Sequence, residues 1–381
     1  MTSRERLLRA FKHEKPDRVP IAPFLYYNDV YEKFKYKPQI HNYYDPEDFD
    51  PIQKMIDYCD DFGFDVLHTL GSVWDAYSMD KPGQDWDARV TFEGDGDNGR
   101  QLLTIRTPGG ELRQVKEFRR SSTYLIVSAL EENLIKTRQD FDILAKYAPP
   151  LDNIDCRLVK RARAAIGSKG LVVAQTNGAF NTLNQFRKLE DIMMDAIEDT
   201  GFYWAMMEYF VNWQHKQNLK QIEAGADAVE ITGNMATSAV GPHFFEKYVL
   251  DYENFLAKGV HKAGAFTVYH NCGDAAKIMH LYNRIEIDVL GYLTPPPFGD
   301  VDLDEALKVM RPDMTLRGNV DQVDFLMHAA PAEIRDRVRT VLGKVKPRGN
   351  WILSTTDFFF DDTPYANIHA FADAGREFGV Y

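Results

Sequence analysis

The second half of the chain repeats one pattern: a short β-rich run that ends in polar or small residues, followed by an amphipathic segment with helical periodicity. Six such runs follow residue 170. They are Leu171–Thr176, Ala226–Ile231, Ala265–His270, Ile287–Tyr292, Met314–Asn319 and Trp351–Thr355. Strands that alternate with helices pair in parallel, because each crossover helix returns the chain to the same edge of the sheet. The pattern therefore predicts an α/β fold with a parallel sheet.

Two earlier runs, Arg18–Ala22 and Phe64–Thr69, bring the expected strands to eight, which is the number that closes a (β/α)8 (TIM) barrel. We expect residues 1–381 to form one barrel domain. An open doubly wound sheet is the alternative, but no glycine-rich nucleotide loop follows the first run.

One region interrupts the alternation. Asp87–Glu93, Gln101–Thr107 and Glu111–Phe118 are strand-like, and Thr107–Gly110 has the composition of a hairpin turn. We expect residues 87–118 to be a small antiparallel β insertion after the second barrel strand.

The charge of the chain limits its partners. It carries 45 basic and 57 acidic residues, a net charge of −12, whereas binding to nucleic acid needs a basic face. It has no apolar run of about 18 residues that would span a membrane, and its first residues lack the apolar core of a signal peptide. We expect a cytoplasmic protein that binds neither nucleic acid nor membrane.

Active sites of such barrels form at the carboxyl ends of the strands. The expected strand ends carry polar side chains that should converge on one mouth, together with aromatic residues on the first two loops. The polar residues are Gln175, Asn177, Glu230, Thr232, Asn234, His270, Cys272, Asp274, Tyr292, Asn319, Asp321 and Asp357, and the aromatic residues are Tyr26, Tyr27, Trp74 and Tyr77. The aromatic residues either line a substrate pocket or cover the top of the barrel.

His270-Asn271-Cys272 is the sharpest signal, because an imidazole and a thiolate two residues apart at a strand end can reach one zinc ion. A purely structural His and Cys is the alternative. Asp357 and Glu230 are the candidates to complete the ligand set. Asp357 could instead be a solvated loop residue, and Glu230 could form an ion pair inside the barrel mouth.

The order of elements and several motifs resemble the uroporphyrinogen decarboxylase family over nearly the whole chain, and members of that family are (β/α)8 barrels. The motifs are Arg4–Phe11, Pro16–Pro20, Gly225–Glu230, His270–Gly273, Gly318–Asp321, Ile352–Ser354, Thr363–Pro364 and Asn367. The decarboxylases of the family hold porphyrinogen carboxylates with an N-terminal arginine-rich motif. The matching stretch here, Ile21–Asn28, contains no arginine, which argues against that substrate.

The other branch of the family comprises cobalamin-dependent methyltransferases, which bind zinc through His-x-Cys and a distant Cys. The resemblance matches His270 and Cys272 to the first pair and places Asp357 where the distant Cys would fall. A carboxylate there would make the ion a stronger Lewis acid and shift the chemistry from sulfur toward oxygen, or it would mean that no metal binds.

The resemblance thus implies a zinc-dependent methyltransferase that exchanges a methyl group between a small substrate and a corrinoid (methylcobalamin) carried by a separate protein. A methoxylated aromatic compound is one candidate substrate. We expect metal ligation by His270, Cys272 and Asp357 or Glu230. Catalytic roles are expected for Glu230, His270 and Asp321, and substrate contacts for Tyr26, Trp74, Asn177, Tyr292 and Asn319.

Two alternatives stay open. The first is a metal-independent decarboxylase of a cyclic or aromatic acid, in which Asp321, His270 or Asp274 acts as the acid or base. The second is a non-catalytic tetrapyrrole or corrinoid binder.

Overall fold

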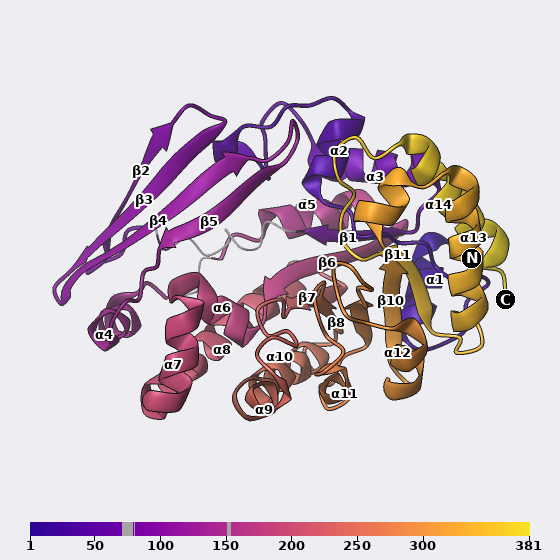
Figure 1. Cartoon of the computed structure of the whole chain (residues 1–381). Coiled ribbons are helices and arrows are strands. Elements are labelled where there is room, and N and C mark those ends of the chain that lie inside the picture. Colours follow the sequence, from indigo (N-terminus) through magenta and orange to yellow (C-terminus); the bar gives the residue numbers. More distant parts are fainter. Residues whose placement is uncertain (71–78, 80, 151–153) are drawn as a thin grey trace.

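A computed structural model describes residues 1–70, 79, 81–150 and 154–381. In this part of the chain a seven-stranded, wholly parallel sheet curls around a central axis, with its strands in chain order (Figure 1). The strands are β1 Val66–Leu70, β6 Gly170–Asn177, β7 Ala228–Thr232, β8 Phe266–Asn271, β9 Val289–Tyr292, β10 Thr315–Val320 and β11 Trp351–Thr355. The prediction of a parallel α/β sheet is confirmed for all seven, with ends shifted by a few residues.

The prediction of an eighth regular strand, Arg18–Ala22, is wrong. This segment forms only two isolated bridges, a parallel one between Ile21 and Leu353 of β11 and an antiparallel one between Arg18 and Val380. It lies between the two edge strands, because Ala22 N–H donates to the Leu353 carbonyl and Asp65 N–H, just before β1, donates to the Ile21 carbonyl. Pro20 and Pro23 lack the N–H groups that a regular strand would need.

The inner face of the sheet is apolar at the amino ends of the strands. Val173, Ala228, Val268 and Val289 face inward there, and helix α1 (Ser3–Phe11) packs its Leu7, Ala10 and Phe11 side chains against them. Because side chains alternate between faces along a strand, the residues two positions further along each strand also point inward. Those positions lead to the carboxyl ends and to the polar residues of the candidate site.

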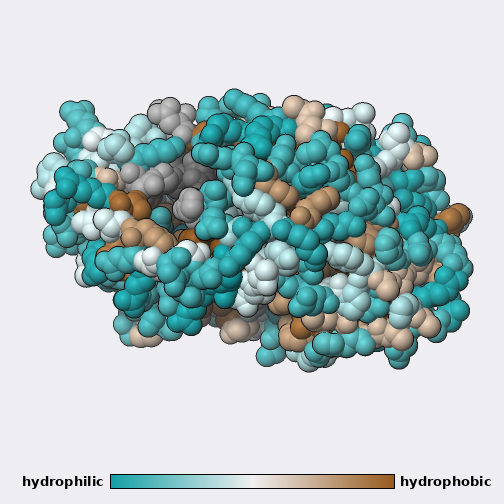
Figure 2. All heavy atoms as spheres, turned by 90° about the horizontal axis from the view of Figure 1, so that it is seen from above, coloured by the Kyte–Doolittle hydropathy of each residue, from teal (hydrophilic) through white to brown (hydrophobic). Residues whose placement is uncertain are grey.

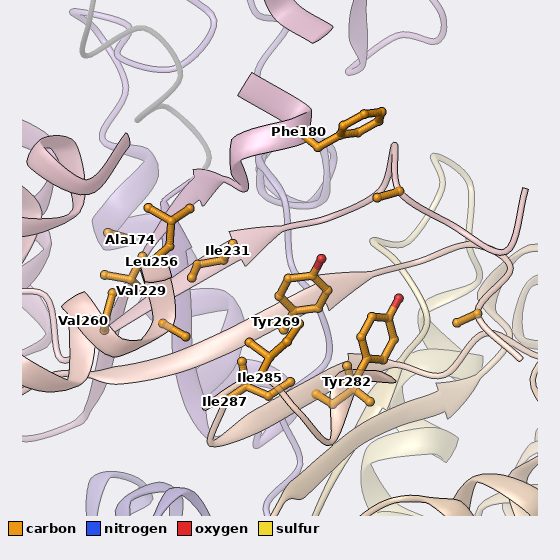
Figure 3. Packing of buried hydrophobic residues seen from close by; sticks show 14 of the residues in the cluster. Ala174, Phe180, Val229, Ile231, Leu256, Val260, Tyr269, Tyr282, Ile285 and Ile287 are labelled. Atoms are coloured by element: carbon orange, nitrogen blue, oxygen red, sulfur yellow. The ribbon is translucent and has the colours of Figure 1, made fainter. Parts of the chain in front are cut away.

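The outward-facing strand residues form a larger core with the surrounding helices (Figure 3). Val229 and Ile231 lie there beside Leu256, and Tyr269 packs beside Tyr282. The helices of this layer and of the loops are α2 Tyr27–Lys33, α3 Pro51–Phe62, α4 Arg138–Tyr147, α5 Arg157–Ile166, α6 Ala179–Phe186, α7 Leu189–Glu198, α8 Thr200–Glu223, α9 Pro242–Phe244, α10 Leu250–Lys262, α11 Met279–Tyr282, α12 Leu303–Val309, α13 Pro331–Val345 and α14 Tyr365–Phe378, with short helical turns at Ile40–Asn42, Phe245–Val249 and Gln322–Leu326.

The antiparallel insertion is confirmed and is larger than predicted. It is a separate four-stranded sheet of β2 Asp87–Gly94, β3 Asn98–Thr107, β4 Gly110–Arg120 and β5 Ile126–Glu132. It lies between β1 and β6 in the chain, and the expected turn joins β3 to β4. The fourth strand was not predicted. Its burial pattern lacks the clean alternation that would have marked it as a half-buried strand.

The surface seen from above the barrel is mostly hydrophilic, with hydrophobic residues in small, separate patches (Figure 2). None of the helices within the described ranges is long and apolar enough to cross a lipid bilayer.

Candidate active site

The centre of the candidate site is the carboxylate of Glu230, which β7 directs into the barrel. Its Oε1 lies 2.7 Å from Nδ1 of His270 on β8 and accepts a hydrogen bond of 3.1 Å from Nε2 of Gln175 on β6. Its Oε2 accepts a hydrogen bond of 3.3 Å from the Tyr292 hydroxyl and lies 3.6 Å from Nη1 of Arg317 on β10. The barrel thus places one buried carboxylate among four inward-facing partners from four strands.

The electrostatics of this cluster favour an ion pair. Burial alone would raise the pKa of Glu230, but His270, Arg317 and Tyr292 outweigh it and hold the pKa below its usual value. Burial alone would lower the pKa of His270, whereas its interactions with Cys272 and Glu230 raise that pKa to about 10. The arrangement matches the alternative expected for Glu230, an ion pair inside the barrel mouth.

The other ring nitrogen of His270, Nε2, is buried and has no hydrogen-bond partner in the part of the chain that the structure describes. Cys272 interacts with the imidazole, and since Glu230 occupies the Nδ1 side, we infer that the thiol faces the Nε2 side. The turn that carries Cys272 is shaped by Asn271, whose Oδ1 accepts from Gly273 N–H at 3.0 Å and whose amide donates to the Tyr282 hydroxyl at 2.6 Å. His270 therefore presents one nitrogen to Glu230 and the other to a thiol.

Asp357 follows the edge strand β11 and lies close to Cys272, which follows the central strand β8. The two side chains interact, and burial raises the pKa of both. The turn before Asp357 is held by Gln322, whose Oε1 accepts the N–H groups of Thr356 and Asp357, each at 3.2 Å. Asp357 is half-buried, so the alternative of a solvated loop residue does not describe it.

These donors are of the types that zinc accepts. Within residues 1–70, 79, 81–150 and 154–381, however, no three His, Cys, Asp or Glu side chains lie close enough together to form a ready metal site. The unpartnered Nε2 of His270 fits a metal ligand whose other nitrogen is fixed by a carboxylate. Glu230 faces that other nitrogen, Nδ1, so it does not share the position open to an ion at Nε2.

An aromatic group covers the cluster. The Phe24 ring meets His270 and Tyr292 edge-on, with both centroid distances 5.4 Å. Tyr26 stacks on Phe24 at 6.4 Å and on Phe358 at 5.5 Å. Phe358 is the neighbour of Asp357, so the aromatic residues connect the two edges of the mouth. They form one wall beside His270.

The remaining predicted residues lie at different places. Asn177 ends β6 and Asn319 lies on β10, and both are buried at the carboxyl end of the sheet. Asp321 begins the turn after β10, and its carboxylate accepts the N–H groups of Val323 at 2.8 Å and Phe325 at 3.2 Å rather than contacting Glu230. Asp274 is exposed. Trp74 lies outside the described residues.

Sequence reasoning missed Arg317 and the role of Gln175. A signal for Arg317 was present, because it is the one charged residue of a fully buried strand, at a position that alternation directs inward. Phe24 was also missed, since the expected strand ends at Ala22 and nothing in the sequence separates a wall residue from an ordinary core aromatic.

Comparisons with known proteins place this site in a family. The family described as Uroporphyrinogen decarboxylase (URO-D) matches residues 126–378. A methylcobamide:CoM methyltransferase, MtbA, of Methanosarcina mazei is 21% identical over 247 residues, which is 64% of this chain and 70% of the relative. A uroporphyrinogen decarboxylase of Gloeobacter violaceus is 25% identical over 179 residues, 46% of this chain and 48% of the relative.

Among solved structures, a methyltransferase from Methanosarcina mazei superimposes with a TM-score of 0.71 at 16% identity, covering 99% of each chain. That likeness shows a shared fold. Because the family match covers well over half of the sequence, the chain belongs to the uroporphyrinogen decarboxylase family. Its relatives named above include both methyltransferases and decarboxylases.

Proposed function

We propose that this protein transfers a methyl group between a corrinoid and a small substrate, at a zinc ion held by His270, Cys272 and Asp357. The observation that supports the proposal is the different environment of the two ring nitrogens of His270. Its Nδ1 faces a buried carboxylate, and its Nε2 is left without a partner beside a thiol, as far as the described residues extend. A histidine that ligates a metal commonly has its second nitrogen fixed in this way.

The similarity to methyltransferases over most of the chain supports the reaction class. The corrinoid and the separate protein that would carry it are taken from the name of the methylcobamide relative and from the branch that the motifs resemble. The weaker candidate, decarboxylation, rests on a relative that matches under half of the chain. Of its three expected acids or bases, Asp321, His270 and Asp274, the first is engaged by two backbone N–H groups.

Each residue then has a distinct part. Zinc, when bound, would stabilise negative charge on the substrate heteroatom that gains or loses the methyl group. Glu230 orients the imidazole and is a positioning residue rather than a ligand. Phe24, Tyr26 and Phe358 offer an aromatic wall that suits a substrate ring and keeps water from the reacting atoms.

The proposal is tested by metal analysis of the untagged full-length protein and of two variants. We expect about one zinc ion per chain, which Cys272→Ala loses and Cys156→Ala retains. Cys156 is the matched control, since it is also a half-buried free cysteine and lies at the start of α5. Methyl transfer is followed by the spectral change of methylcobalamin in the presence of methoxylated or hydroxylated aromatic compounds.

Absence of zinc from the wild-type protein, together with unchanged methyl transfer in Cys272→Ala, would contradict the proposal. Release of carbon dioxide from an aromatic acid by metal-free protein would instead favour the decarboxylase.

A further inference from the structure

One level of the parallel sheet carries polar side chains from four strands. Strand register aligns Asn177 of β6 with Thr232 of β7, and Thr232 with His270 of β8. Gly291 of β9 is aligned with His270 on one side and with Arg317 of β10 on the other. The four polar residues therefore lie at the same height around the barrel.

All four side chains face the interior. Asn177 and Thr232 come four positions after the inward-facing Val173 and Ala228, and His270 comes two positions after the inward-facing Val268, so all three share that face. Arg317 also faces inward, because it forms an ion pair with Glu230. The exposed fractions are 8% for Asn177, 2% for Thr232, 3% for His270 and 1% for Arg317. On β6 and β7, the aligned residues Gln175 and Glu230 lie between this level and the apolar layer that α1 closes from below.

Each of the four has one buried polar atom without a hydrogen-bond partner among the described residues: Asn177 Oδ1, Thr232 Oγ1, His270 Nε2 and Arg317 Nη1. Buried polar groups are nearly always paired in native proteins, so every exception requires an explanation. The zinc ion of the proposed function would account for His270 Nε2. The other three exceptions, at the same level and at the end of the barrel where ligands bind, indicate a polar ligand.

The guanidinium of Arg317 indicates that the ligand is negatively charged. Its guanidinium is held in place because Nε and Nη2 donate to the Ala22 carbonyl at 3.3 and 3.2 Å, and Nη2 also donates to the Pro23 carbonyl at 3.2 Å. The group also lies over the Tyr292 ring, 4.6 Å from its centroid. Only Nη1 is left, and at 3.6 Å from Glu230 Oε2 it forms an ion pair but no hydrogen bond.

Space beside Arg317 comes from Gly291. A Cβ atom at this aligned position would have only Cβ and Cδ of Arg317 within 4 Å, both at the ordinary contact distance of 3.8 Å. The level therefore combines a fixed cationic donor, two oxygen atoms able to accept hydrogen bonds, and a strand position with no side chain.

We infer that this level binds an anionic oxygen of the substrate, a carboxylate, through Arg317 Nη1, with Asn177 and Thr232 binding a neighbouring hydroxyl. The inference deepens the proposed function and rests on it, because it names the substrate class of the same site: a small aromatic carboxylic acid. A charge-assisted bond to a preorganised guanidinium favours a carboxylate over a neutral group of the same shape.

The first test compares matched ligands on the wild-type full chain by isothermal titration calorimetry. The probes are 2-, 3- and 4-methoxybenzoate and the corresponding methoxybenzamides, which differ in charge but hardly in shape. We expect at least one benzoate to bind with a Kd roughly 10- to 100-fold lower than that of its amide. Equal affinities, tighter binding of the amides, or no binding of any benzoate would overturn the inference.

The second test assigns the selectivity to Arg317. Arg317→Met should abolish the preference for benzoate over benzamide, and Arg317→Lys should keep part of it. Arg311→Met should leave it unchanged, because Arg311 is likewise held by backbone carbonyls, of Asn283, Ile285 and Ile287, but away from the site. If Arg317→Met does not fold, the Glu230→Gln/Arg317→Met double variant, which removes both charges, takes its place. Retained selectivity in the variant tested would overturn the assignment.

These binding measurements need no corrinoid, so the two proposals fail separately. Carboxylate selectivity without any methyl transfer would refute the methyltransferase and leave the anion site standing. Methyl transfer that proceeds equally well with benzamides would support the methyltransferase and refute the anion site.

Discussion

Two buried glutamates on neighbouring elements have opposite environments. Glu230, in the middle of β7, is 0% exposed and lies among His270, Gln175, Tyr292 and Arg317. Glu253, on α10, is 1% exposed, and neither of its oxygens has a hydrogen-bond partner within the described part of the chain. The first carboxylate is held below its usual pKa, while burial raises the pKa of the second to about 8.

The comparison separates a site from its scaffold. Inside the barrel, hydrogen bonds and the Arg317 guanidinium stabilise the negative charge of Glu230. We interpret the role of that charge as orienting the imidazole of His270. Outside the barrel, Glu253 faces the start of α6, where the nearby N–H groups of Ala179 and Phe180 do not offset its burial. It is therefore neutral over most of the ordinary pH range, and the fold tolerates it as a buried acid.

The largest expected effect comes from Glu230→Gln. Removing this charge leaves the Arg317 guanidinium buried without its ion-pair partner, so the free energy of unfolding should fall by about 3–5 kcal/mol. Urea denaturation measures the loss. The control is Glu246→Gln, which breaks the exposed pair with Arg284 and should cost no more than about 1 kcal/mol. Equal stability of Glu230→Gln and wild type would show that the ion pair does not contribute to the free energy of unfolding.

Glu253→Gln should act in the opposite direction. The folded-state pKa of about 8 lies above the ordinary value of 4.5, so the stability conferred by the neutral acid is complete below pH 4.5 and is lost as the pH rises through 8. At pH 8 the variant should be more stable than wild type by on the order of 2–4 kcal/mol, and at pH 5 the difference should nearly vanish. Urea midpoints measured from pH 5 to pH 9 test this. A difference that does not change with pH would mean that Glu253 keeps its charge in the folded protein.

The sequence predicts the strand-end residues better than their roles. The alternation of β-rich runs and helices places His270, Cys272 and Asp357 at one mouth, because parallel strands end at a common edge. It does not show that Glu230 faces Nδ1 and Cys272 faces the other side of the ring, since that depends on side-chain orientation. From the sequence alone, Arg317 is only a charged residue within a strand. Its neighbours become known once the strand register is known.

Two corrections have simple physical causes. The first expected strand contains Pro20 and is followed by Pro23, so the pattern of apolar residues overstated its ability to pair. The segment Ile192–Glu223, which has the sequence pattern of one long amphipathic helix, instead divides into α7 and α8 at Asp199, whose side chain accepts from Phe202 N–H and starts a new helix. The helical spacing of buried positions continues through the break, from Ile192 and Ala196 to Tyr203 and Met207, so periodicity alone does not reveal it.

The contact between Glu253 and α6 offers a smaller and more local test. Gly178 has an ordinary φ of −66°, so its backbone would accept alanine without strain. A Cβ there, however, would lie 2.3 Å from Oε1 and 2.4 Å from Oε2 of Glu253. Gly178→Ala should therefore lower the free energy of unfolding by roughly 1–3 kcal/mol, the usual cost of overpacking.

The cause can be isolated with a double-mutant cycle. In a Glu253→Ala background the obstructing carboxylate is gone, so Gly178→Ala should lose most of its penalty, and the coupling between the two changes should be about 1 kcal/mol or more. If Gly178→Ala is equally costly in both backgrounds, the glycine is required by another neighbour. If it costs nothing in either, the carboxylate moves aside freely, and Glu253 is then not the fixed, unpaired counterpart of Glu230.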